Sequence, residues 1–164
     1  MFKGAITAIV TPFKENGDID EEALRKLVEF QIKNKIDGIV PCGTTGESPT
    51  LDYEEHQKVI EIVINVANGK VPVIAGTGSN SLHEALEMTK KAADAGAEAS
   101  LQVCPYYNKP TQEGLYRHFS AIAKAIDIPH IIYNIQGRTA VNLETTTLAR
   151  LIKEHSNIVG VKEA

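Results

Sequence analysis

The sequence predicts an α/β domain in which short parallel strands alternate with helices. Six runs rich in isoleucine and valine recur at intervals of roughly thirty residues, as in βα units, and amphipathic stretches separate them. Each run is continuously apolar, which is typical of strands that a parallel sheet buries on both faces. The pattern therefore indicates five βα units followed by a sixth strand.

The runs and the stretches between them give bounds for each element in turn. The expected strands cover residues 5–10, 38–41, 71–75, 99–104, 130–135 and 158–161. The expected helices cover residues 20–34, 52–66, 79–95, 114–125 and 143–154. Asp18 or Asp20 is a suitable N-cap for the first helix, and Asn68-Gly69 is suited to end the second.

Two parallel architectures accept this pattern. A (β/α)8 barrel needs eight strands and typically ~250 residues, whereas five or six strands satisfy a doubly wound sheet. A doubly wound nucleotide-binding sheet usually carries a glycine-rich loop after its first strand, but residues 11–13 read TPF. Gly76-Thr77-Gly78 lacks the remaining glycine of the dinucleotide fingerprint, so nucleotide binding is disfavoured.

Composition narrows the function classes. The 164 residues are 43% hydrophobic and 23% charged, which predicts one globular domain over residues 1–164. The net charge of −4 offers no basic surface to nucleic acid or to an anionic membrane. Cys42 and Cys104 lack metal-ligand spacing, which argues against zinc and favours a reducing, cytoplasmic setting. We see neither a signal peptide nor a membrane-spanning apolar run.

The first segment that could carry chemistry is GTTGES, residues 43–48, directly after the second expected strand. Its two glycines let the backbone turn sharply and approach a ligand closely. Its N–H groups and threonine hydroxyls would form a cradle for a small carboxylate. The alternative is a loop whose hydroxyls cap the following helix.

Two further segments follow the fourth and fifth expected strands. CPYYNKP, residues 104–110, presents Tyr106 and Tyr107 rigidly between prolines, although a tyrosine near a loop is often a packing anchor. YNIQGRT, residues 133–139, sets Tyr133 and Arg138 at the same rim. The guanidinium of Arg138 would bind a carboxylate through two parallel hydrogen bonds; the alternative is an ordinary surface arginine.

The fourth segment is GVKEA, residues 160–164, where Lys162 lies in an apolar strand. Burial lowers the pKa of an amine, and a neutral amine is the nucleophile that attacks a ketone carbon. The alternative is a lysine at a strand end that reaches solvent. All four segments follow strands, at the edge where α/β barrels assemble their active sites.

In this order and spacing, GTTGES, PYYNKPTQEGLY, YNIQGRT and GVKEA resemble the dihydrodipicolinate synthase branch of the pyruvate-dependent lyase and aldolase family. GTTGE together with Arg138 favours this branch over the N-acetylneuraminate lyases. The resemblance spans residues 1–164 and implies a (β/α)8 barrel followed by C-terminal helices. This chain would hold strands one to six, as a truncated barrel whose parallel sheet has open edges.

The resemblance implies a role for each matching residue. Lys162 would form an imine with pyruvate, and Tyr133 would donate and accept the protons of that step. Thr44 would relay protons between Tyr133 and Tyr107, the latter coming from a neighbouring subunit. The substrate-binding residues would be Thr45 and Gly46 for the carboxylate of pyruvate and Arg138 for aspartate semialdehyde.

The implied reaction is the condensation of pyruvate with L-aspartate 4-semialdehyde in lysine and diaminopimelate biosynthesis, with neither a metal nor an organic cofactor. The family's lysine feedback site has partial matches, from which the chain departs at Pro49 and Tyr53. The matching residues are Ser48, His56, Asn80, Glu84 and Tyr106.

The chain departs from the family at three other positions: Gln102 replaces an apolar residue, Cys104 a threonine or serine, and Gln136 a proline. One face of the fourth strand carries polar side chains, because side chains alternate between the two faces and this face holds Ser100, Gln102 and Cys104. A buried glutamine is costly unless it is hydrogen-bonded. One interpretation is that this face no longer lies inside a closed barrel, as in an engineered or shortened part-barrel; a natural fragment is the alternative.

The missing strands bear on function. Open sheet edges and an uncovered apolar interior favour self-association into a homo-oligomer. Three hypotheses follow: a lyase that acts through a lysine imine, a folding fragment without turnover, and a binding module for small carboxylates. An adduct of Lys162 with pyruvate would separate the first from the second, and affinity for pyruvate that survives Lys162→Ala would indicate the third.

Overall fold

Six parallel strands and the helices between them make up the fold in this computed structural model, which describes residues 2–164. The strands are β1 (Ile6–Ala8), β2 (Gly38–Val40), β3 (Ile74–Gly76), β4 (Ala99–Val103), β5 (His130–Asn134) and β6 (Ile158–Glu163). The helices are α1 (Glu21–Lys33), α2 (Tyr53–Ala67), α3 (Leu82–Ala95), α4 (Gln112–Ala125), α5 (Gln136–Thr139) and α6 (Thr145–Glu154), with a 3-10 turn η1 (Ser48–Thr50). The expected strands and helices are confirmed. The short η1 and α5 are additional, because neither sequence carries an apolar repeat.

The strands lie side by side in chain order. β1 pairs with β2, β3 to β6 form a continuous ladder, and every pairing is parallel. A parallel bridge between Ile39 and Val73 connects β2 to β3. A doubly wound sheet would reverse its strand order at a switch point, and the described residues contain no such reversal. The partial-barrel architecture is confirmed.

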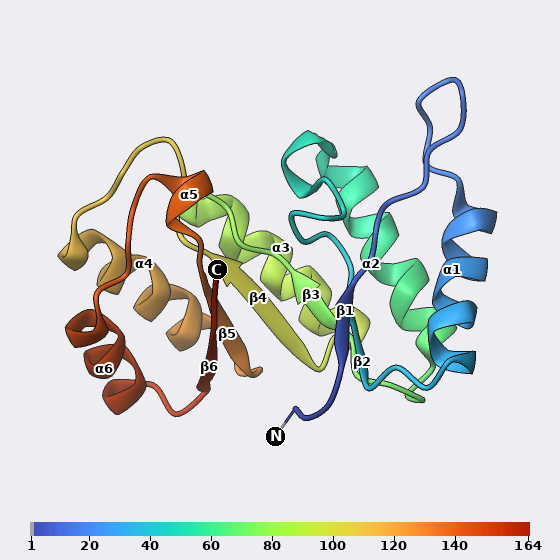
Figure 1. Cartoon of the computed structure of the whole chain (residues 1–164). Helices are drawn as coiled ribbons and strands as arrows, with labels where there is room; N and C mark the ends of the chain where they lie inside the picture. Colours follow the sequence, from blue (N-terminus) through green and yellow to red (C-terminus); the bar gives the residue numbers. More distant parts are fainter. Residues whose placement is uncertain (1) are drawn as a thin grey trace.

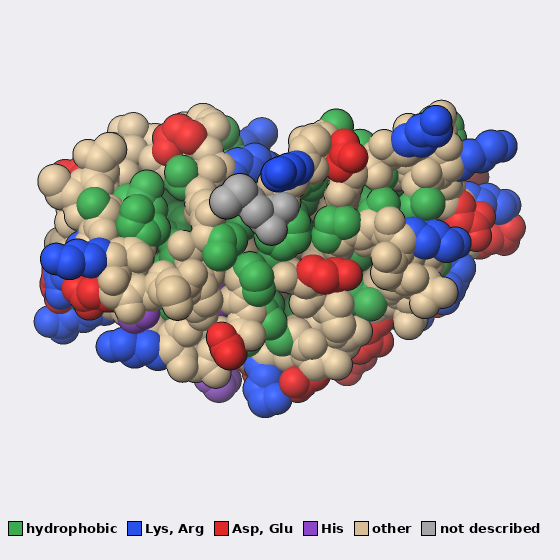
Figure 2. All heavy atoms as spheres, turned by 90° about the horizontal axis from the view of Figure 1, so that it is seen from below, with side chains coloured by type: hydrophobic (Ala, Val, Ile, Leu, Met, Phe, Trp, Pro, Cys, Tyr) green, Lys and Arg blue, Asp and Glu red, His purple; other side chains and the backbone are tan. Residues whose placement is uncertain are grey.

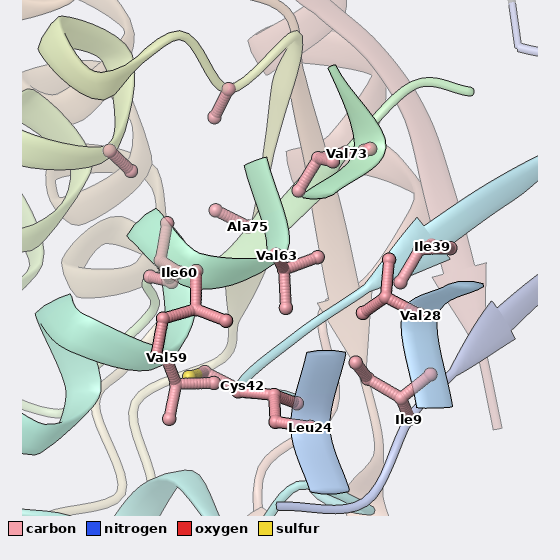
Figure 3. Packing of buried hydrophobic residues seen from close by; sticks show 14 of the residues in the cluster. Ile9, Leu24, Val28, Ile39, Cys42, Val59, Ile60, Val63, Val73 and Ala75 are labelled. Carbon is pink, nitrogen blue, oxygen red and sulfur yellow. The ribbon is translucent and has the colours of Figure 1, made fainter. Parts of the chain in front are cut away.

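The helices form a single layer on one side of the strands. Neighbouring helices pack against each other in the order α1, α2, α3, α4 and α6, and Figure 1 shows them flanking and backing the strands. The largest apolar cluster lies between this layer and the first three strands, where Leu24 and Val28 of α1 meet Val59 and Val63 of α2 (Figure 3). Fully burying such a side chain contributes about 1.5–3 kcal/mol, so this cluster holds α1 and α2 against the sheet.

Local signals explain where the helices begin. Asp20, one of the two expected N-caps, accepts a hydrogen bond from the backbone of Ala23. Asp52 forms a capping box with Glu55 at the start of α2, because each side chain accepts from the other residue's backbone N–H. Asn68 ends α2 in the left-handed region, as expected. In the part of the chain that the structure describes, no helix combines the length and apolar character needed to cross a membrane.

The opposite, inner face of the strands has no helix over it among residues 2–164. Val40, Ile74, Leu101 and Tyr133 form its apolar centre. These four side chains are each less than 9% exposed, so the inner face is apolar and free of helices while its centre is largely covered by its own neighbours. Figure 2 looks from below at the edge where the strands begin, and there hydrophobic side chains reach the surface mainly between the more charged ends of the molecule.

Gln102 does not lie on that inner face. The interpretation that the polar side chains of β4 face the interior of an open barrel is therefore wrong. Its side chain is 1% exposed and lies between β4 and α3. The amide nitrogen donates to Thr77 Oγ1 and Thr89 Oγ1, both at 2.8 Å, and to Ser100 Oγ at 3.0 Å. These bonds satisfy the buried amide nitrogen, whereas Oε1 has no partner among the described residues. Ser100 continues the network to Nδ1 of His130 at 2.7 Å.

Three buried histidines give the folded state a dependence on pH. Burial lowers the pKa of His56 and of His118 to about 4, and it lowers the pKa of His130 against the opposing effect of the hydrogen bond that the His130 ring makes to the Ile126 carbonyl. In the unfolded chain a histidine titrates near a pKa of ~6.5. Below that pH the unfolded chain takes up protons that the folded chain does not bind, so stability is lost as pH falls toward the folded pKa.

We predict that the free energy of unfolding falls between about pH 6.5 and pH 4.5 by up to about 1.4 kcal/mol per pH unit for each of these histidines. Urea titrations across this window measure the slope. The carboxyls whose pKa is lowered by ion pairs, such as Glu113, contribute mainly below about pH 5 because their ordinary pKa is 4.5. His118→Leu reduces the slope by one proton, whereas His83→Gln, which alters a ring that is 89% exposed, leaves it unchanged. Equal slopes in His118→Leu and the parent chain would contradict this account.

Candidate functional site

A cavity of about 250 Å³ lies where β2 to β5 end. Because parallel strands in chain order send their carboxyl ends to one edge, the loops that follow them converge there. Of the residues singled out in the sequence, Thr44, Ser48, Tyr106, Tyr133 and Arg138 line this cavity. The other lining residues are Cys42, Gly43, Pro49, Gly76, Gly78, Leu101, Val103, Ile135 and Thr139.

The GTTGES loop is held in a compact turn beside the cavity. Its amides at Gly46 and Ser48 donate to the Gly43 carbonyl, and the amide of Glu47 donates to the Thr44 carbonyl. The amides of Thr44 and Thr45 donate to no group within residues 2–164. Two adjacent free N–H groups form the kind of concavity that binds an anion. Thr44 lines the cavity, whereas Thr45 is exposed and does not.

Close backbone contacts fix the position of this loop. A Cβ on Gly76 of β3 would lie 2.1 Å from the Cys42 carbonyl oxygen, so only glycine lets the strand and the loop meet. Cys42 itself is in the left-handed region at φ 52°. Gly46 is buried beneath the loop, where its carbonyl accepts a 2.7 Å hydrogen bond from Thr11 Oγ1. The structure therefore gives Gly46 a packing position rather than one on the cavity wall.

Tyr133 and Lys162 are directly paired across the parallel β5–β6 ladder. Tyr133 is buried and lines the cavity, and the Nζ atom of Lys162 lies 4.0 Å from the centroid of its ring. Lys162 is exposed and is not among the lining residues. Of the two interpretations of Lys162, the structure therefore shows the side chain that reaches solvent. Its amine still lies against the phenol ring.

The two adjacent tyrosines of the loop after β4 have different surroundings. Tyr106 is partly buried and lines the cavity. Tyr107 is 89% exposed, at a positive φ of 70°, and lies outside it. A bulky residue in the left-handed region is unusual. The loop thus displays Tyr107 outward, away from Thr44 and Tyr133.

Arg138 reaches the cavity from α5, a one-turn helix that the sequence does not predict. Thr139 follows it and is buried, with its hydroxyl donating to the Ile135 carbonyl at 3.0 Å. Thr139 lines the cavity but is absent from the residues expected at the site. In the sequence, the only signal for Thr139 at the site is that its hydroxyl directly follows Arg138.

A second cavity of about 240 Å³ adjoins the first and shares Ser48, Pro49, Gly78 and Tyr106 with it. Four of the five expected effector residues line it; Asn80 does not. The lining residues are Ser48, Pro49, Leu51, Asp52, Tyr53, His56, Gly78, Ser79, Glu84, Met88 and Tyr106.

His56 is the most deeply buried ionisable group of that second cavity, at 3% exposed. Neither of its ring nitrogens makes a hydrogen bond of good geometry with the described residues. Glu84 accepts a 2.6 Å hydrogen bond from Ser79 Oγ at the same wall. Burial, reinforced by Glu87 and Glu84, raises the pKa of Tyr53 to about 12, so its hydroxyl stays protonated.

The described residues contain no group of three histidine, cysteine, aspartate or glutamate side chains arranged to hold a metal ion. The two cysteines are buried and unbonded to each other. Burial raises the pKa of both thiols, to about 12 for Cys104, where the charge of Glu163 adds to the effect. Neither thiol is therefore activated as a nucleophile.

Comparisons with known proteins give a consistent result. The sequence model of the dihydrodipicolinate synthetase family matches residues 1–164. The 4-hydroxy-tetrahydrodipicolinate synthases of Pelobacter propionicus and Geotalea uraniireducens are 63% and 65% identical to this chain, over all of it and 56% of each relative. The chain thus spans a little over half the length of these relatives.

Solved structures agree with the sequences. The dihydrodipicolinate synthase from Aquifex aeolicus superposes with a TM-score of 0.97 at 54% identity, over 99% of this chain and 55% of that one. The 4-hydroxy-tetrahydrodipicolinate synthase of Methylacidiphilum fumariolicum SolV gives a TM-score of 0.98 at 51% identity, over 100% of this chain and 54% of that one.

We predict that Gly76→Ala displaces the 42–48 loop and lowers the free energy of unfolding by about 1–3 kcal/mol. The new Cβ would meet backbone atoms of Cys42 and Gly43, which cannot rotate away as a flexible side chain can. Chemical denaturation measures the loss. Gly137→Ala is the matched control, since a Cβ there meets nothing within 4 Å and the residue lies in helix α5. Equal stabilities of the two variants would show that the contact does not constrain the loop.

Proposed function

Because this chain belongs to the dihydrodipicolinate synthetase family, we propose that its residues serve the condensation of pyruvate with L-aspartate 4-semialdehyde through a lysine imine. This is a lyase-type reaction of lysine and diaminopimelate biosynthesis. The observation that carries the proposal is the pairing of Lys162 with Tyr133 at the cavity that Thr44 lines. We further propose that residues 1–164 fold as one partial-barrel domain, in the cytoplasm.

In the proposed reaction the Lys162 amine attacks the ketone carbon of pyruvate. The ketone oxygen takes up a proton, the nitrogen loses one, and water leaves to give the imine. Tyr133 is the proton donor and acceptor, since a phenol beside the amine can both protonate the leaving hydroxyl and remove a methyl proton to form the enamine. The enamine carbon then attacks the aldehyde carbon of the semialdehyde, whose oxygen takes up a proton. The amino group of that substrate next adds to the imine carbon and displaces the Lys162 amine, which closes the product ring and frees the lysine. This chemistry needs neither a metal nor an organic cofactor.

Binding of the two carboxylates is assigned to two segments at the cavity, the 43–48 loop and helix α5. The free amides of Thr44 and Thr45 would hold the carboxylate of pyruvate, and Gly46 supports that turn from beneath. Arg138 would pair with the carboxylate of the semialdehyde. The exposed Tyr107 would contribute its phenol to a neighbouring copy, since it lies outside its own cavity.

We propose that this chain alone forms the imine but turns over little. Lys162 is exposed and the inner face is uncovered, so water enters the site and weakens its electrostatic interactions. A folding fragment without turnover remains the competing function. A binding module for small carboxylates is the third, and it would hold pyruvate in the absence of the amine.

The uncovered inner face favours association of copies of the isolated 164-residue chain. Its central cluster around Val40, Ile74 and Leu101 is only 2–8% exposed, so the exposed apolar side chains are those of the edge strands, at Ile6 of β1 and at Val159 and Val161 of β6. β1 and β6 also each pair with only one strand among the described residues. Unpaired edges and apolar faces recruit other chains. We expect a solution mass above the 17.8 kDa of one copy. Sedimentation at a single-copy mass over a wide concentration range would contradict this expectation.

A second proposed function is regulation by lysine through the cavity that His56 and Glu84 line. The supporting observation is that Tyr106 belongs to the walls of both cavities, so a ligand in one contacts a wall of the other. The buried His56 offers ring nitrogens, and Glu84 offers a carboxylate for an ammonium group. Labelling of Lys162 by pyruvate at a rate that lysine leaves unchanged at every concentration would contradict the proposal.

We predict that pyruvate followed by borohydride forms a stable covalent adduct on Lys162, located by peptide mass spectrometry. Lys162→Ala abolishes the adduct, because reduction traps only an imine. Tyr133→Phe lowers the labelling rate by about 100-fold, the lower end of what a positioned general acid and base contributes.

Two matched variants control that experiment. Tyr116→Phe removes a phenol that bonds to Glu154 on the outer surface, and Lys153→Ala removes an exposed lysine of α6; both leave labelling unchanged. Adducts spread over many lysines, or an unlabelled Lys162, would contradict the proposal of an imine on Lys162. Pyruvate affinity that persists in Lys162→Ala without any adduct in the parent would favour the binding module.

A further inference from the structure

Strand alternation places two residue pairs back to back at the carboxyl ends of β5 and β6. Tyr133 pairs with Lys162, and Asn134 pairs with Glu163 one position further along. Tyr133 belongs to the inner-face cluster, and Lys162 lies against its ring. Successive side chains in a strand point to opposite faces. Asn134 and Glu163 therefore meet on the outer face, directly behind the phenol and the amine.

Asn134 is 2% exposed and uses every hydrogen-bonding position of its side chain. Its Nδ2 donates to both carboxylate oxygens of Glu163, at 2.8 and 3.1 Å, and to Asn142 Oδ1 at 2.8 Å. Its Oδ1 accepts from the Leu143 amide at 3.0 Å and from the Cys104 thiol at 3.8 Å. The carboxylate requires a donor and the Leu143 amide requires an acceptor, so these partners fix the orientation of the side-chain amide.

The β5–β6 ladder needs such a constraint because its register is irregular. His130 pairs with Ile158 but Ile131 pairs with Gly160, which leaves Val159 as an extra residue that is 51% exposed. Beyond the bulge, further contacts must determine which residue of β6 pairs with which residue of β5. A shift of one residue in a strand moves every later side chain to the opposite face. Such a shift in β6 would carry Lys162 away from Tyr133.

We propose that the Asn134–Glu163 hydrogen bonds lock the register of β6 on β5 and thereby position the Lys162 amine against the Tyr133 phenol. Glu163 is then a positioning residue that acts through the backbone on the other face. Its consequence for imine formation rests on the function proposed above, whereas the lock itself concerns only the geometry of the chain.

Glu163 is exposed, but its carboxylate is bound by Asn134 at the strand end. Because Asn134 is itself only 2% exposed, its amide loses a partner at a cost in free energy when the Glu163 carboxylate is removed. The bonds also join three segments, since Asn134 simultaneously holds Asn142 and Leu143 of the loop before α6. β6 is thereby tied to the loop before α6 as well as to β5.

The lock is tested first without pyruvate, by NMR of the full 164-residue chain. A methylene group held over an aromatic ring resonates upfield, so the ε-protons of Lys162 report its position over Tyr133; Lys162→Arg assigns the signal. We expect Glu163→Ala to abolish the upfield shift while amide exchange in β3 and β4 stays protected. Glu163→Gln keeps it, because the glutamine oxygen still accepts from Asn134. Glu144→Ala is the matched control: this carboxylate lines the same outer hollow as Glu163 and makes no side-chain hydrogen bond with the described residues.

The second readout is the rate of pyruvate labelling of Lys162 in the same variants. Glu163→Ala lowers the maximal rate by about 10- to 100-fold, the scale of a misplacement near one ångström, while half-saturating pyruvate changes by less than about twofold. Glu163→Gln restores the rate to within about threefold of the parent, and Glu144→Ala leaves it unchanged.

Three outcomes decide the matter. An upfield signal that survives Glu163→Ala overturns the lock, even where labelling falls. Equal losses in Glu163→Gln and Glu163→Ala also overturn it, because charge rather than the hydrogen bond would then be responsible. A parent chain that shows the expected NMR behaviour but no labelling refutes the proposed function and leaves the lock standing.

Discussion

Parallel pairing of the strands in chain order is the constraint on which the rest of the structure depends. Each strand must return to the same starting edge, so each crossover is a helix, and all carboxyl ends meet at the opposite edge. That geometry brings together Thr44, Tyr133 and Arg138, which lie far apart in sequence. It also gives the sheet two unlike faces, one packed against a continuous helix layer and one uncovered within residues 2–164.

The two faces of the sheet have different roles. The inner face carries the groups assigned to chemistry, and the outer face holds the strands in register with hydrogen bonds among buried polar side chains. Gln102 links β4 to β3 and α3, and Asn134 links β5 to β6. Buried polar groups that are fully bonded specify one arrangement, because every alternative leaves a donor or acceptor unpaired. Gln102 Oε1 is an exception, since it has no partner among the described residues.

Local signals in the sequence suffice for most of the fold. Isoleucine and valine runs identify the strands, and the capping box of Asp52 and Glu55 identifies the start of α2. The partners of Gln102 lie 25 and 13 residues away, at Thr77 and Thr89, so its helix-facing position could not be inferred from the parity of β4 alone. The one-turn helix α5 is too short to show an apolar period.

The site is predictable to a lesser degree. The four motifs name the residues, but which of two neighbours faces a cavity depends on the path of the loop: Thr44 lines it and Thr45 does not, and Tyr106 lines it while Tyr107 points outward. Likewise Asn80 lies outside the second cavity although Ser79 and Glu84 line it. The exposure of Lys162 depends on what covers the inner face, which no property of its own strand specifies.

The central claim is that Lys162 and the amides of the 43–48 loop together hold one pyruvate. A crystal structure of the chain after reaction with pyruvate and borohydride tests it most directly. The claim predicts electron density continuous with Nζ of Lys162, with the carboxylate of the adduct within hydrogen-bond distance of the Thr44 and Thr45 amides. An adduct whose carboxylate turns to solvent, or that forms on another lysine, would contradict it.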